Sequence, residues 1–390
     1  MSCANYPGLY VHIPFCKTKC PYCDFYSVTD ETLISAYLTA LDTEARFYRD
    51  QFPAFDSLFL GGGTPSWLGE AQIAELMKNL RRHFTFAPEC EVTIEANPDD
   101  ITPDKLALFR DLGVNRLSLG VQSFDEAELR FLQRRHTAAQ TERALSLIRA
   151  AGFTNLGLDL MYGLPGQSLD AWTNTLETAL SFNPEHLSGY QLTVAAETPL
   201  GRRVAGGRVR LPDEETQRQF FLLTANFLTA HGYLHYEVAN FARQGPQAGS
   251  LCYYCCRHNV KYWTRTPYLG LGPAAHSFQA GRRWWNFASV GRYCSSLDAG
   301  RPPVAGQESL TPEQIRLETL ALGFRTREGV SLGTIREQPG ADAILSELEQ
   351  AGLVRVDHDR VIATSDGLVV ADRLPLWFAD GDGRLGSGET

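Results

Sequence analysis

Short apolar runs alternate with longer amphipathic segments from the N-terminus to about residue 235. The apolar runs have the length of buried strands and are bounded by polar residues and glycines. The six predicted strands are Leu9–Ile13, Ser57–Leu60, Glu91–Ile94, Arg116–Leu119, Leu156–Met161 and Leu187–Leu192. The predicted helices between and after them are Leu33–Arg49, Glu70–Arg82, Pro103–Leu112, Thr141–Ala151, Asp170–Leu180 and Glu215–Ala230. Strict alternation of this kind predicts an α/β fold with a parallel sheet and right-handed crossovers.

Polar and glycine residues follow the ends of these strands. Gly61–Pro65 follows the second strand, Glu95 ends the third, Gln122 lies just beyond the fourth, and Asp159 lies within the fifth. The carboxyl ends of parallel strands meet at one rim of a β/α barrel, where the sites of this architecture are built. The pattern therefore predicts a partial (β/α)6 barrel of the TIM type with a site at its C-terminal rim.

The alternation stops near residue 236, and the remaining chain divides into three parts. Helical patterns return at Pro312–Phe324 and Ala341–Ala351, and two short apolar runs, Leu353–Val356 and Arg360–Ala363, follow as a hairpin. This order predicts a C-terminal winged-helix-like α+β domain. The expected organisation is a barrel at 1–235, a loop-rich connecting region at 236–307, the C-terminal domain at 308–380 and a flexible tail at 381–390.

Charge and hydrophobicity narrow the class of protein. The chain has 390 residues, a net charge of −9 and a pI near 5.5, so we expect no nucleic-acid partner, which would need a basic face. The N-terminus has no charged segment followed by an apolar one, and no stretch approaches the ~20 apolar residues of a membrane span. We expect a cytoplasmic protein, with peripheral membrane contact left open.

Three of the nine cysteines lie close together as Cys16-x3-Cys20-x2-Cys23, directly after the first strand. Clustered cysteines in a reducing compartment indicate metal ligation or redox chemistry, and soft thiolates select zinc or iron–sulfur centres. Three ligands without a fourth leave a metal position open, whereas structural zinc is closed by four. A zinc site completed by His12 or a distant cysteine, and cysteines that only pack in the core, are the alternatives.

The stretch LYVHIPFCKTKCPYCDF resembles the signature of the radical S-adenosylmethionine (SAM) superfamily, and its HIPFC opening resembles the HemN/HemW branch. The resemblance implies a [4Fe–4S] cluster held by Cys16, Cys20 and Cys23, with SAM bound to the fourth iron. It further implies that one-electron reduction of SAM yields methionine and a 5′-deoxyadenosyl radical.

The same resemblance assigns SAM-binding positions along the rim. The implied residues are Tyr10, Gly62, Gly63, Thr64, Glu95, Gln122, Arg134 and Asp159. Taken singly, the glycines are typical of a turn, the carboxylates of an ion pair and Arg134 of a solvated helix. Their order along the chain favours the SAM site. His136 follows closely, as a group behind the site or as a polar surface residue.

Two functions remain within the branch: a heme chaperone that delivers heme to respiratory hemoproteins, and oxygen-independent coproporphyrinogen III dehydrogenation in porphyrin biosynthesis. Dehydrogenases of the branch carry a fourth cysteine two positions after the third, where this chain has Phe25, and an N-terminal extension that this chain lacks. The segment His258–Trp263 matches the HNxxYW motif of the chaperone group. The resemblance thus favours the chaperone. Whether the chain is also an enzyme, whether its acceptors are membrane-associated and whether it forms a homodimer stay open.

The HNxxYW motif offers a heme ligand. An imidazole is a common axial ligand of heme iron, so we expect His258 to bind heme, with Tyr262 and Trp263 offering apolar faces. The alternative is that His258 caps a turn and the two aromatic residues pack in the core. His276 is a second candidate ligand, and for Cys252, Cys255 and Cys256 we favour the absence of a metal.

Overall fold

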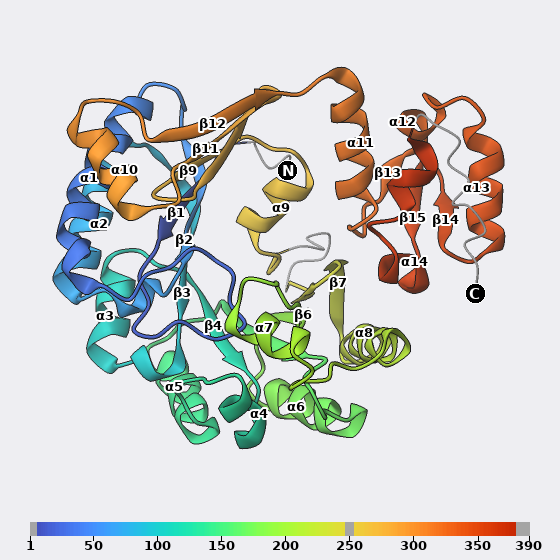
Figure 1. The fold of residues 1–390 in the computed structure, drawn as a ribbon, viewed down its shortest axis with the longest axis horizontal. Coiled ribbons are helices and arrows are strands. Elements are labelled where there is room, and N and C mark those ends of the chain that lie inside the picture. The colour runs from blue at the N-terminus through green and yellow to red at the C-terminus, as the bar shows by residue number, and fades with distance from the viewer. Residues whose placement is uncertain (1–5, 246–252, 380–390) are drawn as a thin grey trace.

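The computed structural model describes residues 6–245 and 253–379. Its largest feature is a 12-stranded sheet in the order β12-β11-β10-β9-β1-β2-β3-β4-β5-β6-β8-β7. Seven neighbouring strands, β9 and β1 to β6, run parallel to one another. Helices cover the outer face of the curved sheet, as Figure 1 shows. The predicted α/β fold and partial barrel are confirmed.

All six predicted strands are present, with ends extended or shifted by a few residues. They are β1 (Gly8–Ile13), β2 (Phe55–Gly62), β3 (Phe86–Ala96), β4 (Arg116–Gln122), β5 (Leu156–Tyr162) and β6 (His186–Gln191). The six predicted helices are present as α1 (Ile34–Tyr48), α2 (Glu70–His83), α3 (Pro103–Asp111), α5 (Ala138–Ala150), α6 (Leu169–Ser181) and α8 (Glu214–Ala230). The pattern missed the short helices α4 (Glu126–Phe131) and α7 (Pro199–Ala205).

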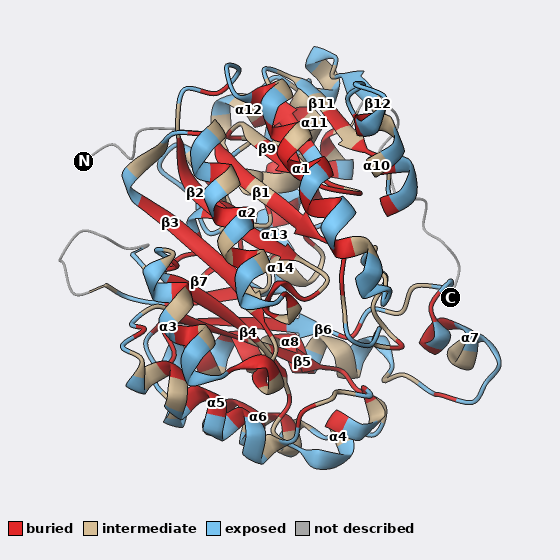
Figure 2. Ribbon diagram, turned by 90° about the vertical axis from the view of Figure 1, so that its left-hand side faces the viewer, coloured by how far each residue is buried: buried red, intermediate tan, exposed pale blue. Residues whose placement is uncertain are grey.

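The core lies between the sheet and its helices. Apolar strand residues such as Leu60, Ile94 and Leu117 are fully buried there, and each helix turns one apolar face toward them. Figure 2 shows the sheet as a buried layer beneath helices whose outer faces are exposed. Side-chain caps such as Thr137, which accepts a hydrogen bond from the backbone N–H of Gln140, fix where the helices begin.

The segment 236–307, predicted as loops, instead contains regular structure on both edges of the sheet. Its helices are α9 (Arg257–Trp263) and α10 (Val290–Asp298), and its strands are β8 (Asn240–Arg243), β9 (Tyr268–Leu271), β10 (His276–Gln279), β11 (Arg282–Asn286) and β12 (Val304–Ser309), while β7 (Tyr233–Glu237) spans the predicted boundary. These strands have only four to six residues, too few to show an alternating pattern. The loop prediction was wrong because strand pairing, not local sequence, stabilises them: β9 pairs with β1, β8 with β6 and β7, and β10, β11 and β12 with their neighbours in the sheet.

The C-terminal part has a core and a small sheet of its own. Its elements are α11 (Pro312–Gly323), β13 (Val330–Ser331), α12 (Leu332–Arg336), α13 (Ala341–Gln350), β14 (Val354–Asp357), β15 (Arg360–Ala363), α14 (Ser365–Val369) and a final 3-10 turn, Leu374–Phe378. The sheet order is β13-β15-β14, and Figure 1 shows this part beside the barrel. The predicted limits at 235, 307 and 380 stay predictions, and the predicted tail, 381–390, and Cys252 lie outside the described residues.

The helices of the described residues include no candidate for a membrane span. Within 6–245 and 253–379, none of the helices combines the length and the apolar character needed to cross a bilayer.

Candidate functional site

A cavity of about 450 Å³ opens at the C-terminal ends of the parallel strands. Ten of the twelve residues predicted for the site line it. They are Cys16, Cys20, Cys23, Gly62, Gly63, Thr64, Glu95, Gln122, Arg134 and Asp159. The strand ends thus bring together residues that are up to 143 positions apart in the chain (159 minus 16).

The three cysteines lie on the loop that leaves β1 and returns toward it. The backbone N–H of Cys16 donates to the Val28 carbonyl at 3.0 Å, and the Val28 N–H donates to the Pro14 carbonyl at 2.7 Å. This pairing closes the loop at its base and holds the thiols at the cavity. Burial raises the pKa of the Cys23 thiol.

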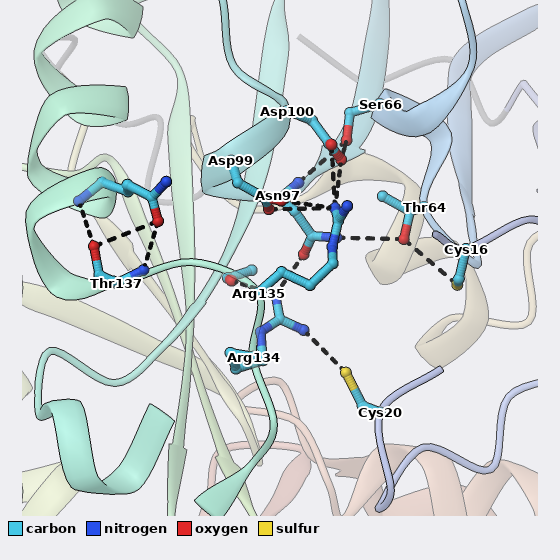
Figure 3. Close-up of polar contacts among 12 residues, drawn as sticks. Cys16, Cys20, Thr64, Ser66, Asn97, Asp99, Asp100, Arg134, Arg135 and Thr137 are labelled. Atoms are coloured by element: carbon cyan, nitrogen blue, oxygen red, sulfur yellow. Dashed lines mark hydrogen bonds and ion pairs between the residues drawn. The ribbon is translucent and has the colours of Figure 1, made fainter. Parts of the chain in front are cut away.

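Two of the thiols accept hydrogen bonds from the rim, as Figure 3 shows. Thr64 Oγ1 donates to Cys16 Sγ at 3.5 Å, and Arg134 Nη1 donates to Cys20 Sγ at 3.6 Å. Asn97 joins the two donors: its Nδ2 donates to Thr64 Oγ1 at 3.3 Å, and its Oδ1 accepts from Arg134 Nη2. The sequence reasoning missed Asn97, although it follows Glu95 by two positions at a strand end.

The glycines after β2 are required by close backbone approach. Gly62 has φ +110°, a left-handed conformation that favours glycine, and a Cβ there would lie 2.6 Å from the His12 ring. A Cβ on Gly63 would lie 2.7 Å from the Phe15 carbonyl oxygen. The bare backbone therefore lies directly against the cysteine loop.

Two carboxyl groups that line the cavity, those of Glu95 and Asp159, have raised pKa values. Burial and, secondarily, the neighbouring Asp159 raise the pKa of Glu95 to about 7. Burial also raises the pKa of Asp159, although hydrogen bonds from Ser188 and Ser118 act to lower it. Two buried carboxyls with raised pKa values in one cavity favour a cationic ligand, which would stabilise their ionised forms.

Backbone strain marks the end of β4. Gln122 has φ +67°, uncommon for a residue with a side chain, and the pairing of β4 with β5 shifts by one residue between Gly120 and Gln122. This bulge lies at the rim, and Gln122 lines the cavity. Strained residues of this kind cluster at functional sites.

The donor set fits an iron–sulfur cluster with a bound nucleotide. Three thiols line one cavity and two accept hydrogen bonds, an arrangement that stabilises thiolates bound to iron. Among the described residues, no three His, Cys, Asp or Glu side chains approach closely enough to hold a single metal ion. The buried Nε of Arg134 has no hydrogen-bond partner, which leaves a donor for an anionic group such as a carboxylate.

Tyr10 and His258, the other two predicted residues, are not part of the cavity lining. The Tyr10 hydroxyl is 3.0 Å from His12 Nδ1, and His12 Nε2 is 2.9 Å from the Tyr26 carbonyl in the cysteine loop. Tyr10 thus contacts the site through His12. His136, noted as a residue behind the site or on the surface, is buried and lines the cavity.

His258 lies at the other end of the barrel, where α9 closes the N-terminal side. Its Nδ1 is 3.0 Å from Ser57 Oγ, its Nε2 is 2.9 Å from the Tyr262 hydroxyl, and the residue is 1% exposed. Burial lowers its pKa to about 3. Both ring nitrogens are engaged, so this arrangement favours the structural alternative over heme ligation.

Further contacts fix α9 in place. The Glu91 carboxylate accepts hydrogen bonds from the backbone N–H groups of Arg257 and His258, at 3.1 and 3.2 Å. Lys261 forms a buried ion pair with Asp56 at 2.6 Å. Cys255 and Cys256 are also buried here, and the Cys256 thiol donates to Glu91 at 3.8 Å.

Comparison with known proteins agrees with this geometry. A model of the radical SAM superfamily matches residues 10–179, and a model of the HemN C-terminal domain matches 310–370. The heme chaperone HemW of Mycobacterium tuberculosis is 36% identical over 94% of this chain and 93% of its own length. The chain belongs to the HemW family. The HemW of Bacillus subtilis is 34% identical over 94% of this chain and 97% of its own length.

A solved structure gives the same fold as this HemW-family chain. The coproporphyrinogen III oxidase HemN of Escherichia coli, described as a radical SAM enzyme, superposes with a TM-score of 0.81 and 27% identity. The match covers 96% of this chain and 90% of HemN. Membership in the radical SAM superfamily implies a [4Fe–4S] cluster and SAM, the two cofactors that the sequence predicted for this site.

Proposed function

We propose that this protein is a heme chaperone, which binds heme and delivers it to respiratory hemoproteins. The observation that carries the proposal is similarity over nearly the full length to proteins named heme chaperone HemW, at 36% identity. HemN, a coproporphyrinogen III oxidase, is 27% identical. The position of the fourth cysteine in dehydrogenases of the branch is occupied here by Phe25, which is 66% exposed and cannot ligate iron.

The proposed cluster ligands are Cys16, Cys20 and Cys23, and the remaining cavity residues would bind SAM. When bound, the two cofactors supply one-electron reductive cleavage of SAM. The protein's own contribution is to orient them: Gly62 and Gly63 allow close backbone approach, Arg134 suits the SAM carboxylate, and Glu95 and Asp159 suit its amino group and ribose hydroxyls. Tyr10 would act through His12.

The proposed cellular setting follows the function. The chaperone would act in the cytoplasm and reach acceptors that include membrane-associated hemoproteins by peripheral contact, and a homodimer is the proposed assembly. No nucleic acid takes part. The second candidate function, coproporphyrinogen III dehydrogenation, is favoured by the likeness to the HemN fold.

One experiment separates the two functions. The protein is reconstituted anaerobically and divided between a hemin titration and an assay with coproporphyrinogen III, SAM and reductant. We expect a saturable Soret band, transfer of heme to an apo-hemoprotein, and no protoporphyrinogen. Formation of protoporphyrinogen at the rate of a dehydrogenase would replace the chaperone assignment, and failure to bind hemin would refute it.

A further inference from the structure

The histidines of the chain differ sharply in their surroundings. The chain has nine, and all lie in the described residues. Eight have at least one ring nitrogen in a hydrogen bond: His12, His83, His136, His186, His231, His235, His258 and His358. His276 is exposed, and neither of its ring nitrogens has a hydrogen-bond partner within the described part of the chain. It therefore offers an imidazole that no other group in residues 6–245 and 253–379 engages by a hydrogen bond.

His276 begins β10, in the part of the sheet that extends beyond β1. It is paired across the ladder with Trp285 of β11, and the two rings stack with centroids 5.9 Å apart and planes 24° apart. Trp285 itself packs over Gly306 of β12, where a Cβ would lie 2.5 Å from the indole. Trp285 is thus packed against β12 on one side, and its indole stacks on the imidazole of His276.

The face that carries His276 is the aromatic face of the sheet extension. Side chains two positions apart share a face, so His276 lies on the side of Phe278. The Phe278 ring is 6.2 Å from that of Tyr268, which contacts Tyr262 of α9 at 4.6 Å. The Phe278 ring is buried, with the Arg265 guanidinium over it, so a planar apolar ligand at His276 would lie beside Arg265 and the edge of this aromatic cluster.

The surroundings of His276 disfavour the charged form of its imidazole. Partial burial and, secondarily, the guanidinium of Arg283 lower the pKa of His276. A neutral imidazole has the lone pair that a metal requires. Arg283 pairs with Glu308 and with Glu318, and Arg265 also pairs with Glu318 and lies over the Phe278 ring. Two arginines thus border the face, where carboxylates of a ligand can exchange with the glutamates.

We propose that His276 is the axial ligand of the heme that this protein carries, with Trp285 packed against the imidazole and the porphyrin on the aromatic face of β10. The inference rests on the proposed chaperone function. It assigns the iron ligand to the sheet extension, in place of the closed end of the barrel where His258 lies.

The test is a hemin titration of the full-length chain and its variants, followed by absorbance and by electron paramagnetic resonance of the ferric heme. His276→Ala removes the ligand, and because the side chain is exposed the variant should fold normally. His231→Ala, at an exposed helix end, is the matched control. We expect His276→Ala to weaken binding at least about tenfold and to lose the signature of nitrogen ligation, with the control unchanged. Free imidazole should restore that signature to His276→Ala.

The outcomes separate the inference from the function on which it rests. If the unmodified protein binds hemin and His276→Ala binds it with equal affinity and an unchanged spectrum, the ligand assignment is overturned and the chaperone function stands. If His258→Ala alone loses the nitrogen signature while keeping its thermal stability, the ligand is His258. If the unmodified protein binds no hemin, both the function and the inference fail.

Discussion

The two ends of the barrel are built from the same strands but differ in what lies between them, a cavity at one end and helix α9 at the other. At the C-terminal end, the lining of a cavity includes three thiols, the carboxyls of Glu95 and Asp159 and the guanidinium of Arg134, whose buried Nε has no hydrogen-bond partner among the described residues. At the N-terminal end, α9 fills the space: Glu91 binds its first N–H groups, and Lys261 pairs with Asp56.

We infer from this difference that the C-terminal end of the barrel binds cofactors and that the N-terminal end stabilises the fold. Polar groups left without partners cost stability, and they persist where a ligand satisfies them. Polar groups that satisfy one another hold a structural element and offer nothing to a ligand. A sequence motif at the N-terminal end, including His258, is therefore expected to act on stability, and residues at the rim are expected to act on cofactor binding.

The largest effect is expected at the cluster. Cys20→Ser removes one of three thiolates, so anaerobic reconstitution should fall from about four irons per chain to nearly none. Thermal unfolding of the iron-free protein should stay within about 0.5 kcal/mol of the original, because Cys20 is only partly buried. Iron analysis checks the loss of iron, and calorimetry checks the unchanged stability. Cys294→Ser, on α10, is the control and should keep its iron; normal iron in Cys20→Ser would refute the ligand assignment.

The opposite pattern is expected for Lys261→Met. The substitution leaves the Asp56 carboxylate buried without its ion-pair partner, and breaking such a pair costs about 3–5 kcal/mol. Urea unfolding of the iron-free chain measures the loss. Lys78→Met, exposed on α2, provides the baseline and should change stability by less than about 0.5 kcal/mol. A Lys261→Met protein that keeps its stability but fails to bind the cluster would contradict the assignment of stability to the N-terminal end and of cofactor binding to the rim.

The sequence predicted the rim better than it predicted the closed end. Strand order alone places Glu95, Gln122 and Asp159 together, because parallel strands bring their carboxyl ends to one edge. The position of α9 depends on contacts such as His258 with Ser57, 201 residues apart, which no local pattern encodes. Strands β9 to β12 were missed because each is short, and β9 in addition depends on β1, which is far away in the chain.

The protonation of Glu95 predicts how SAM binding depends on pH. Its pKa is raised to about 7, chiefly by burial, so the free site is largely protonated below pH 7. A cationic ligand favours the ionised carboxylate, so the affinity for SAM should increase as the pH rises through about 7. Calorimetric titration of the reconstituted protein from pH 6 to 8 tests this. Glu95→Gln should bind about tenfold more weakly and lose this pH dependence, whereas Glu142→Gln, exposed on α5, should not.

The smallest effect is expected for Asn97, which contacts the thiols only through Thr64 and Arg134. Asn97→Ala should keep its iron. It should bind SAM about threefold more weakly, because Arg134 loses one of its fixed acceptors. A less firmly held N–H···S contact at Cys20 should also make the reduction potential of the cluster more negative. Redox titration followed by electron paramagnetic resonance measures the shift, with Asn174→Ala on α6 as control. An unchanged reduction potential in Asn97→Ala would mean that the hydrogen bonds to Cys16 and Cys20 do not depend on Asn97. The strand ends alone would then determine the geometry of the rim.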